Sequence, residues 1–373
     1  MERIKVIEYI SNLGDGGAET LVKDYVRLID RKQFDPVVVI MKGGEESANR
    51  RILEENNIPV YEIFSHWDFC VRIFKKALGW WYIPFKLRKI IRKEKAQVMH
   101  MHLIVLKDLP RVGKALRDLR LFFTCHSTPD VAFSKDLAVE RKAAMHLIHN
   151  ENMQLIALHN EMAKQLNEMF LVENTVVIRN GIDFKKFLNS GMTADIEREK
   201  LGIPKDAFVI GHVGRFSKEK NHAFLVDVFF EVARDHANSF LLMVGAGNTE
   251  VIEEKLKSNG FDNRYLILSH RTDVNEIMRV MDVFVFPSIY EGLGIALIEA
   301  QVSGLRCIAS DNVPADAFRT ENAIALPLGN PEKWANAVLD RSIKGCSHGT
   351  LDEYDMNKEI RRLEKLYLGE TLS

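Results

Sequence analysis

Short apolar segments rich in β-branched residues alternate along this chain with amphipathic segments of helical periodicity. The first examples are the strand-like residues 4–10 (IKVIEYI) and 35–41 (DPVVVIM), with the helix-like residues 17–30 (GAETLVKDYVRLID) between them. Parallel strands need a crossover connection of a dozen or more residues, which is usually a helix. The alternation, which continues to residues 174–181 (NTVVIRNG), therefore predicts an α/β fold with an open parallel sheet.

The alternation lapses between Asp183 and Asp206, where glycines and a proline interrupt it, and it restarts at residues 208–216 (FVIGHVGRF). A chain of 373 residues also exceeds the usual size of a single hydrophobic core. We therefore predict two Rossmann-like domains that face each other across a cleft. The predicted parts are an N-terminal domain (1–184), a linker (185–205), a C-terminal domain (206–352) and a last helix (353–373) that packs back toward the N-terminal domain.

The overall composition excludes several classes of protein. The net charge is -1, and 46% of the residues are hydrophobic, which indicates a folded chain and gives no case for nucleic-acid binding. The four cysteines lie far apart without metal-binding spacing, as is typical of reduced thiols. The first strand begins without an apolar leader, and no run of eighteen apolar residues exists. We expect a cytoplasmic protein.

In open parallel sheets, ligands bind beyond the carboxyl ends of the strands. Glycines 16 and 17 follow the first strand and open a helix, where backbone N–H groups can receive a phosphate, although a tight turn without a ligand explains them equally well. His126 follows another strand, where it is either a loop residue or part of a site. The turn VGAGNTE departs from the dinucleotide fingerprint because Glu250 replaces its last glycine, which disfavours a nicotinamide cofactor.

Arg215 and Lys220 lie in a short loop after a buried strand, VGRFSKEKNH, and supply the fixed positive charge that a diphosphate needs. A solvated charged surface is the alternative interpretation. Metal ligation is not expected, because the histidines form no HExxH pattern and no Asp-x-Asp pair is present. His100 and His102, in MHMH, are interpreted as the end of an alternating strand.

Two glutamates, Glu291 and Glu299, lie eight residues apart in SIYEGLGIALIEAQVSG. On one regular helix they would be separated by about 80° around the axis and by roughly 12 Å along it, too far apart to share one site. We therefore predict that Glu291 lies in the glycine-containing loop and that Glu299 lies in the first turns of the following helix. There the two acids can contact different parts of one elongated ligand.

Residues 66–95 hold nine Lys and Arg against two acids, interleaved with aromatic residues. They belong to a predicted domain, 1–184, with 28 Lys and Arg against 24 Asp and Glu, a net charge of +4. A basic helix with aromatic residues suits an anionic membrane surface. A helix that packs on the sheet and has a solvated basic face is an equal alternative, and single-stranded nucleic acid is ranked below both.

Taken together, the motifs GGAE, VIRNGID, VGRFSKEKNH, VGAG and the Glu-x7-Glu block of residues 271–304 resemble those of glycosyltransferase family 4, also called the glycosyl transferases group 1 family. The resemblance covers almost the whole chain. It implies the GT-B fold, a nucleotide-sugar donor, most readily a UDP-sugar, and transfer of a hexosyl or N-acetylhexosaminyl group with retention and without a metal or other cofactor. We expect the acceptor to be a glycan, lipid-linked in capsule or exopolysaccharide assembly at the inner face of a membrane, because the nucleotide-sugar site is combined with the basic and aromatic stretch that ends at Lys95.

The resemblance also implies roles for individual residues. Arg215 and Lys220 would hold the donor diphosphate, Glu299 the ribose hydroxyls, and Glu291 the sugar hydroxyls. Backbone N–H groups at Leu293 and Gly294 would lie beside the sugar. Gly16 and Gly17 would lie beside the phosphates, and His126 would lie near the reacting carbon. The family usually has an aromatic residue at the position of Leu293.

Three other functions stay open at this point. A nucleotide-sugar 2-epimerase of the same fold would act on the donor alone, without an acceptor. An NAD-dependent oxidoreductase is favoured only by the glycine-rich turns. A catalytically silent nucleotide-binding partner subunit is disfavoured by the complete set of Arg215, Lys220, Glu291 and Glu299.

Overall fold

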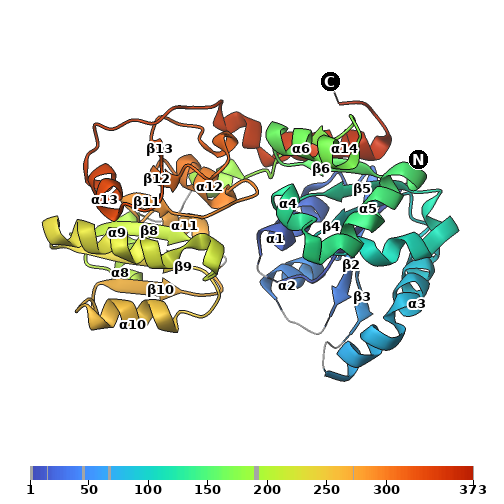
Figure 1. The fold of residues 1–373 in the computed structure, drawn as a ribbon, viewed down its shortest axis with the longest axis horizontal. Helices are drawn as coiled ribbons and strands as arrows, with labels where there is room; N and C mark the ends of the chain where they lie inside the picture. Colours follow the sequence, from blue (N-terminus) through green and yellow to red (C-terminus); the bar gives the residue numbers. More distant parts are fainter. Residues whose placement is uncertain are drawn as a thin grey trace. The chain divides into compact units, whose positions relative to one another are not determined.

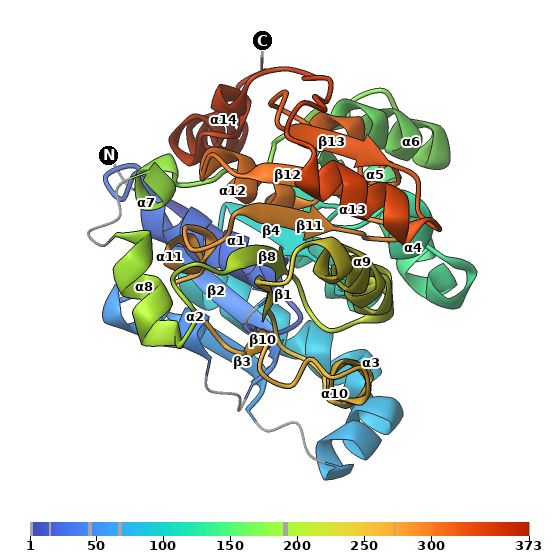
Figure 2. The ribbon, with the colours of Figure 1, turned by 90° about the vertical axis from the view of Figure 1, so that its left-hand side faces the viewer.

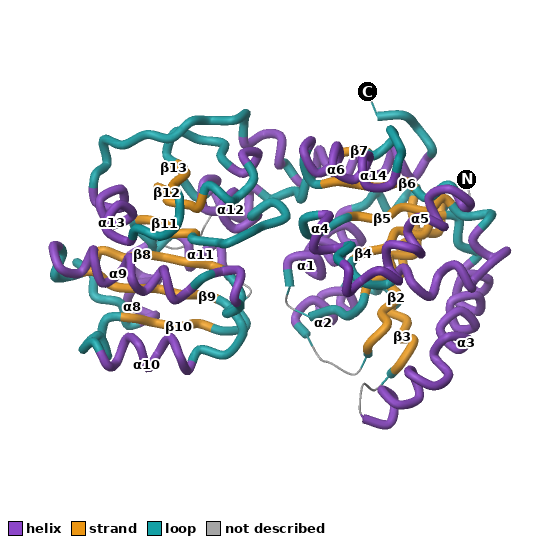
Figure 3. Tube along the Cα trace, in the orientation of Figure 1, coloured by secondary structure: helices purple, strands orange, loops and turns teal. Residues whose placement is uncertain are grey.

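The structure is a computed structural model that describes residues 3–14, 16–43, 47–65, 69–188, 193–271 and 273–372, with only the backbone described for 69–78. The chain divides into two compact units. The first consists of Met1–Gly181 together with Met356–Ser373, and the second of Ile182–Asp355. Each unit contains one parallel sheet with helices beside it, as Figure 3 shows.

The sheet of the first unit has seven described strands in the order β3-β2-β1-β4-β5-β6-β7 (Figure 1). All of its neighbouring strands pair in parallel, and the register places Glu8 opposite His100. The strands are β1 (Ile4–Ile10), β2 (Phe34–Lys42), β3 (Val60–Phe64), β4 (Val98–His102), β5 (Arg120–Thr124), β6 (Gln154–Ala157) and β7 (Val176–Val177).

Helices connect these strands, and the last helix of the chain also belongs to this unit. They are α1 (Gly17–Leu28), α2 (Ala48–Glu55), α3 (Phe69–Glu94), α4 (Pro129–Ala132), α5 (Ala138–Glu151), α6 (Asn160–Phe170) and α14 (Met356–Leu368), with 3-10 helices η1 (Leu106–Leu116) and η2 (Lys135–Leu137). Helix α14 is amphipathic and buries Ile360, Leu363 and Tyr367 against α1 and the sheet. The last helix is therefore part of the core of the first unit.

The second unit has a sheet of six described strands in the order β10-β9-β8-β11-β12-β13. The strands are β8 (Phe208–Val213), β9 (Ser239–Val244), β10 (Tyr265–Leu268), β11 (Val283–Phe286), β12 (Arg306–Ser310) and β13 (Ala323–Leu326). The helices are α7 (Phe184–Leu188), α8 (Ala194–Leu201), α9 (His222–Asp235), α10 (Glu250–Ser258), α11 (Val274–Met278), α12 (Ile295–Val302) and α13 (Pro331–Leu339), with η3 (Lys218–Lys220), η4 (Ala315–Ala317) and η5 (Leu351–Tyr354). Helices α9 and α13 lie side by side (Figure 2) and bury Phe229 and Trp334.

Both predicted parallel sheets are present, so the predicted α/β class is confirmed. The predicted linker, 185–205, instead carries α7 and α8 and belongs to the second unit, and the first unit ends at Gly181 where the sequence suggested 184. A partly buried contact explains this difference: Arg198 of α8 donates to the Val280 carbonyl and forms an ion pair of 2.9 Å with Asp282. Among the described residues, no helix combines the length and the apolar character needed to cross a membrane.

Candidate functional site

The strand order of the second sheet reverses at β8, which lies between β9 and β11. Loops that leave neighbouring strands at such a switch point diverge to opposite faces of the sheet, and ligands of open α/β sheets bind in the gap between them. The loop after β8 carries Arg215 and Lys220, and the loop after β11 carries Glu291. Arg215, Lys220 and Glu291 therefore come from the two loops at the switch point, and Glu299 comes from the helix α12 that follows the second loop.

Lys220 and Glu291 form an ion pair across these two loops. The Lys220 Nζ lies 2.5 Å from the Glu291 Oε1, and the two side chains are only 17% and 12% exposed. The same Nζ lies 4.9 Å from the centre of the buried Phe286 ring. A backbone bond of 2.8 Å, from the N–H of Ile289 to the carbonyl of Glu219, also joins the loops. The loops thus present one cation and one carboxylate side by side.

Arg215 is a second cation on the loop after β8. Its side chain is 70% exposed and lies 3.9 Å from Glu219, a contact that screening by water makes weak. Because the guanidinium is charged and accessible, it can bind an anion such as a phosphate bidentately.

Close backbone packing explains one glycine of this region. A Cβ at Gly245, just after β9, would lie 1.9 Å from the Gly214 carbonyl oxygen, which no side chain can tolerate. The loops after β8 and β9 can therefore approach each other only with glycine at position 245, and a bridge between Phe216 and Gly247 continues the contact.

The loop between β11 and α12 ends at a glycine that the backbone requires. Gly294 is the N-cap of α12 and has a φ of +85°, which side-chain-bearing residues rarely adopt. Leu293 is buried, so its side chain packs in the core and its backbone remains at the start of the helix. Glu291 lies in the loop and Glu299 lies, partly exposed, within α12, as the eight-residue spacing predicts.

Two buried histidines, His212 and His222, lie close to Lys220. The sequence motifs did not single them out. His212 bonds through Nδ1 to the Val285 carbonyl at 2.8 Å, and the His222 ring stacks on Phe216 with 4.1 Å between centroids. Burial, with Lys220 adding to it, lowers the pKa of His212 well below its usual value and that of His222 to about 4. Both rings are therefore neutral at physiological pH, and the positive charge of the loop after β8 comes from Arg215, Lys218 and Lys220.

In the first unit, Gly16 is the N-cap of α1 and Gly17 is its first residue. A Cβ at Gly16 would approach the flexible Glu19 carboxylate, whereas a Cβ at Gly17 would meet nothing within 4 Å. The buried Asn49 holds the preceding loop by donating to the Gly14 carbonyl at 2.7 Å, and Asp15 lies outside the described residues. Open space at a helix N-terminus leaves room for an anion, and the contact of these glycines with a phosphate stays a prediction.

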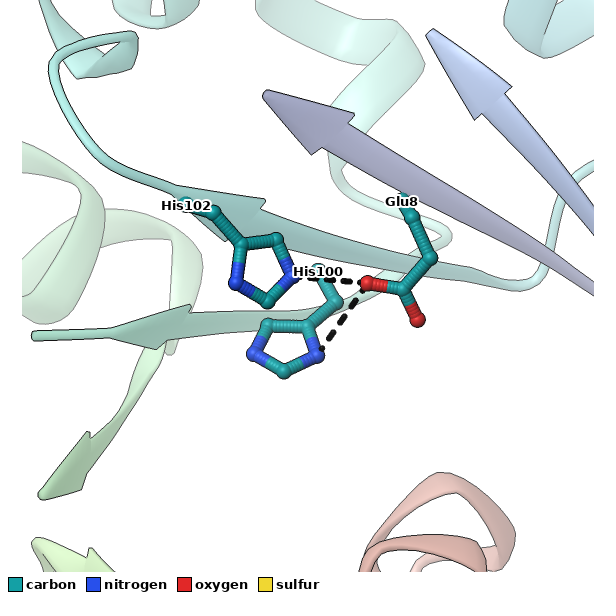
Figure 4. Close-up of side chains that lie close together, drawn as sticks. All are labelled: Glu8, His100 and His102. Atoms are coloured by element: carbon teal, nitrogen blue, oxygen red, sulfur yellow. Dashed lines mark hydrogen bonds and ion pairs between the residues drawn. The ribbon is translucent and has the colours of Figure 1, made fainter. Parts of the chain in front are cut away.

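His126 follows β5 in the first unit and is half-buried. Its Nε2 lies 3.0 Å from the Nδ1 of His102, and the Nε2 of His102 lies 2.7 Å from the Oε2 of Glu8. Figure 4 shows the rings of His100 and His102 on β4 turned toward the Glu8 carboxylate on β1. Burial lowers the pKa of His126 well below its usual value and that of His102 to about 3, whereas it raises the pKa of Glu8 to about 8.

Glu8, His100 and His102 also form, among the described residues, a group whose ligand atoms lie within 4.8 Å of one another, close enough for a metal ion. These atoms already have hydrogen-bond partners. Tyr367 lies 2.7 Å from Glu8 and 2.6 Å from the Nδ1 of His100, and Thr124 lies 2.7 Å from the Nε2 of His100. The arrangement is therefore explained by a buried hydrogen-bond network, and the absence of a metal requirement remains a prediction.

Glu8 and Tyr367 are members of this network that were not expected from the sequence. The signal that could have found it is the alternation in MHMH, which places two histidines on one face of β4, together with an acid inside the apolar strand IKVIEYI. An isolated acid in a buried strand is rare unless it is paired. The identity of its partners depends on strand order, which the sequence does not state.

The chain matches two families that together cover most of its length. Residues 15–186 match the family described as Glycosyltransferase Family 4, and residues 207–341 match the one described as Glycosyl transferases group 1. The EpsF protein of Bacillus subtilis (strain 168), provisionally assigned as a glycosyltransferase, is 40% identical over 91% of this chain and 88% of its own length. A capsular polysaccharide biosynthesis glycosyltransferase of Staphylococcus aureus, CapH, is 24% identical over 99% of this chain and 100% of its own length.

A galactosyltransferase of Escherichia coli, named for UDP-Gal and α-D-GlcNAc-diphosphoundecaprenol, is 26% identical over 76% of this chain and 78% of its own length. Among solved structures, Anabaena Alr3699/HepE in complex with UDP-glucose has a TM-score of 0.78 at 19% identity and covers 98% of this chain and 100% of its own. WaaG, a lipopolysaccharide glycosyltransferase, has a TM-score of 0.68 at 14% identity, with 98% of each chain covered. The two Rossmann-like units thus have the GT-B fold, and the chain belongs to the family 4 (group 1) glycosyltransferases.

Proposed function

We propose that this glycosyltransferase moves a hexosyl or N-acetylhexosaminyl group from a UDP-sugar to a lipid-linked glycan, with retention of configuration, in capsule or exopolysaccharide assembly. The observation that carries the proposal is the pair of Lys220 and Glu291 at the switch point of the second sheet, with the exposed Arg215 on the same loop. This site offers cations for a diphosphate and a carboxylate for sugar hydroxyls.

Each of these residues binds a different part of the donor. Arg215 and Lys220 stabilise the negative charge that grows on the diphosphate as the bond to the sugar breaks. Glu299 accepts hydrogen bonds from the ribose, and Glu291 accepts them from the sugar, beside the backbone N–H groups of Leu293 and Gly294. Because Lys220 is paired with Glu291 before the donor binds, the diphosphate competes with Glu291 for this cation.

Retention follows without a covalent intermediate. The acceptor hydroxyl attacks the anomeric carbon on the face from which the diphosphate departs, so that one C–O bond forms as the other breaks. The hydroxyl proton passes to the departing phosphate oxygen. His126 and the N-terminus of α1, with Gly16 and Gly17, belong to the first unit and are assigned to the reacting carbon and the phosphates. The fixed charges of Arg215 and Lys220 take the place of a divalent metal.

The donor and acceptor are inferred from the names of similar proteins. Anabaena Alr3699/HepE has been solved with UDP and with UDP-glucose, and the Escherichia coli relative is named for UDP-Gal and a diphosphoundecaprenol-linked acceptor. The Staphylococcus aureus relative is named for capsular polysaccharide. These names support a UDP-sugar and a lipid-diphosphate acceptor for this chain.

Helix α3 supports contact with an anionic membrane surface. It buries Ile83 and Leu87 against the first unit, and it exposes 59% of Trp80, 45% of Trp81 and 51% of Phe85. The two interpretations of residues 66–95 are therefore compatible, because one face packs and another exposes aromatic rings. Residues 66–68 and the side chains of 69–78, including Lys75 and Lys76, lie outside the described residues.

A basic pocket lies between α3 and η1. Its volume is about 590 Å³, and its lining residues are Phe85, Arg88, Lys89, Arg92, Val112, Gly113, Lys114 and Ala115. Four cations beside an apolar ring suit the phosphates of a lipid-diphosphate or of an anionic headgroup. Phe85 is both one of the exposed rings of α3 and a lining residue of this pocket, which supports the proposed contact with a lipid.

The enzymatic proposal is tested by a donor screen. UDP-, GDP- and ADP-sugars are offered with and without a diphosphoundecaprenol-linked saccharide, and the product linkage is determined by NMR. We expect transfer only from a UDP-sugar and only with the acceptor, giving a product with the anomeric configuration of the donor. Conversion of the nucleotide sugar without acceptor would identify an epimerase, and an inverted product would refute the retaining mechanism.

The membrane contact is tested by co-sedimentation with vesicles of rising anionic lipid content. We expect Lys86→Glu/Lys89→Glu and Trp80→Ala/Trp81→Ala to weaken binding, and the charge effect to decline as salt rises because screening acts within about 10 Å at 0.1 M. The control is Arg141→Glu/Lys142→Glu, which changes two exposed cations on α5. Equal binding by all variants, or no binding by the wild type at low salt, would leave α3 as a solvated helix.

A further inference from the structure

A chain of hydrogen bonds leads from His126 into the core of the first unit and ends at its last helix. His126 contacts His102 at 3.0 Å, His102 contacts Glu8 at 2.7 Å, and Tyr367 of α14 contacts Glu8 at 2.7 Å. Glu8, His102 and Tyr367 are almost completely buried, whereas His126 at the start of the chain is half-buried. Figure 4 shows the central part of this chain, where Glu8 meets the rings from β4.

The bonding pattern permits two arrangements of the protons. With Glu8 ionised, its Oε2 accepts from the Nε2–H of His102, whose Nδ1 then accepts from the Nε2–H of His126, so that the Nδ1 of His126 has no proton. With a proton on the Oε2, Glu8 donates to His102, whose Nδ1–H donates to the Nε2 of His126, and the proton of His126 is on its Nδ1. Tyr367 donates to the Oε1 of Glu8 in both arrangements.

The free end of the chain is the Nδ1 of His126, which makes no hydrogen bond to the residues that the structure describes. We propose that Glu8 and His102 are positioning residues for His126, and that the proton on Glu8 decides whether this ring nitrogen donates or accepts a hydrogen bond. Tyr367 holds Glu8 in place, so that α14 contributes to the same site. The proposal rests on the proposed function in one respect, because it assigns His126 to the donor sugar.

Charge balance explains how a proton can move along this series of hydrogen bonds without forming an imidazolium. A proton that reaches the Nδ1 of His126 displaces the proton on Nε2 to His102, and His102 passes its own Nε2 proton to Glu8. One proton enters, the carboxylate is neutralised, and both rings end neutral. A charged ring would be unfavourable here, because burial already lowers the pKa of His102 to about 3.

The surroundings of Glu8 favour its protonated form. The titratable groups that face it are His100 and His102 on β4, Tyr367 on α14 and Tyr25 on α1. In their neutral forms, none of these groups supplies a positive charge that would stabilise the ionised carboxylate. Burial raises the pKa of Glu8 to about 8. Below that pH the Nδ1 of His126 is therefore a donor, which suits the hydroxyl and phosphate oxygens of a nucleotide sugar.

The variant Glu8→Gln separates this role from a purely structural one. The amide can donate to the Nε2 of His102 and accept from Tyr367, which fixes the donor arrangement at every pH. In NMR spectra of the full-length protein labelled with ¹⁵N-histidine, we expect the wild-type rings of His102 and His126 to change tautomer together as pH rises through about 8. In Glu8→Gln both rings keep the proton on Nδ1.

Transfer gives a second readout. We expect Glu8→Gln to retain transfer within about threefold at pH 7 and to lose the decline that the wild type shows above pH 8, whereas Tyr367→Phe shifts that decline. The matched control is Glu140→Gln, a buried glutamate of the same unit that bonds the backbone N–H groups of Leu106 and Lys107. This control should keep the wild-type pH profile.

Three outcomes would overturn the proposal. They are a His126 tautomer that does not change between pH 6 and 9 in the wild type, an identical tautomer change in Glu8→Gln, and one equivalent of tightly bound metal at Glu8, His100 and His102 in the purified protein. Because tautomers are measured without substrate, they test the relay even if the chain uses another donor. A relay that is present in a protein without UDP-sugar transfer would refute only the proposed function.

Discussion

Replacing Glu8 with glutamine should stabilise the first unit, and the gain should grow with pH. Burial raises the pKa of Glu8 from its ordinary value of 4.5 to about 8 in the folded protein. Between these values the folded state holds a proton that the unfolded state has lost, so folding must take up a proton. The contribution of Glu8 to stability is therefore fully present below about pH 4.5 and is lost as pH rises to about 8.

The size of the effect follows from the two pKa values. Each pH unit between them costs about 1.4 kcal/mol, so the full loss is roughly 5 kcal/mol. Between pH 5 and pH 7 the wild type should lose roughly 2 to 3 kcal/mol of stability through this group. Glutamine has no proton to lose and keeps both hydrogen bonds, to His102 and to Tyr367. Relative to the wild type, the variant should therefore gain roughly 2 to 3 kcal/mol over the same interval.

The measurement is urea unfolding of the full-length protein, read by hydrogen exchange of peptides from β1 and β4 at each pH. This readout isolates the first unit, which matters because a protein with two units need not unfold in one step. Comparing wild type and variant at the same pH cancels the intrinsic pH dependence of exchange.

A free-energy difference that stays constant within about 0.5 kcal/mol from pH 5 to pH 8 would refute the reasoning, because the expected change is several times larger. A gain that grows toward low pH would show that Glu8 is ionised in the folded state. The control is Glu62→Gln, in strand β3 of the same sheet, which removes an ion pair with Arg50 and should give no gain that grows with pH.

Three further predictions concern the second unit and the reaction. Lys220→Ala and Glu299→Ala should each lower transfer at least tenfold, about 1.4 kcal/mol of transition-state stabilisation, with unchanged circular dichroism, and near wild-type activity in both would remove the donor site from these loops. Transfer should persist in excess EDTA because Arg215 and Lys220 supply the positive charge, and a strict Mg²⁺ or Mn²⁺ requirement would contradict this. Gly294→Ala should destabilise the second unit by roughly 1 to 2 kcal/mol in thermal unfolding because of its φ of +85°, and an unchanged melting temperature would contradict that.

The sequence by itself determined the α/β class and placed several residues of the candidate site in the loops after β8 and β11. Strand and helix periodicities are local properties, and parallel strands place their carboxyl ends at one edge of a sheet, so Arg215, Lys220 and Glu291 could be assigned to loops at that edge. The eight-residue spacing was enough to separate Glu291 from Glu299, because a regular helix could not bring both acids to one point. These inferences needed no knowledge of which strands are neighbours.

Only the tertiary structure decided which of these residues meet. The ion pair between Lys220 and Glu291, 71 positions apart, exists because β11 lies next to β8, a strand order that local patterns do not encode. The contact between Glu8 and Tyr367, 359 positions apart, requires the last helix to return to the first unit, and the contact between Glu8 and His102 requires β1 to pair with β4. Both depend on long-range packing of buried surfaces, and for that reason an acid in a strand and two histidines in MHMH could not be recognised as one network from the sequence.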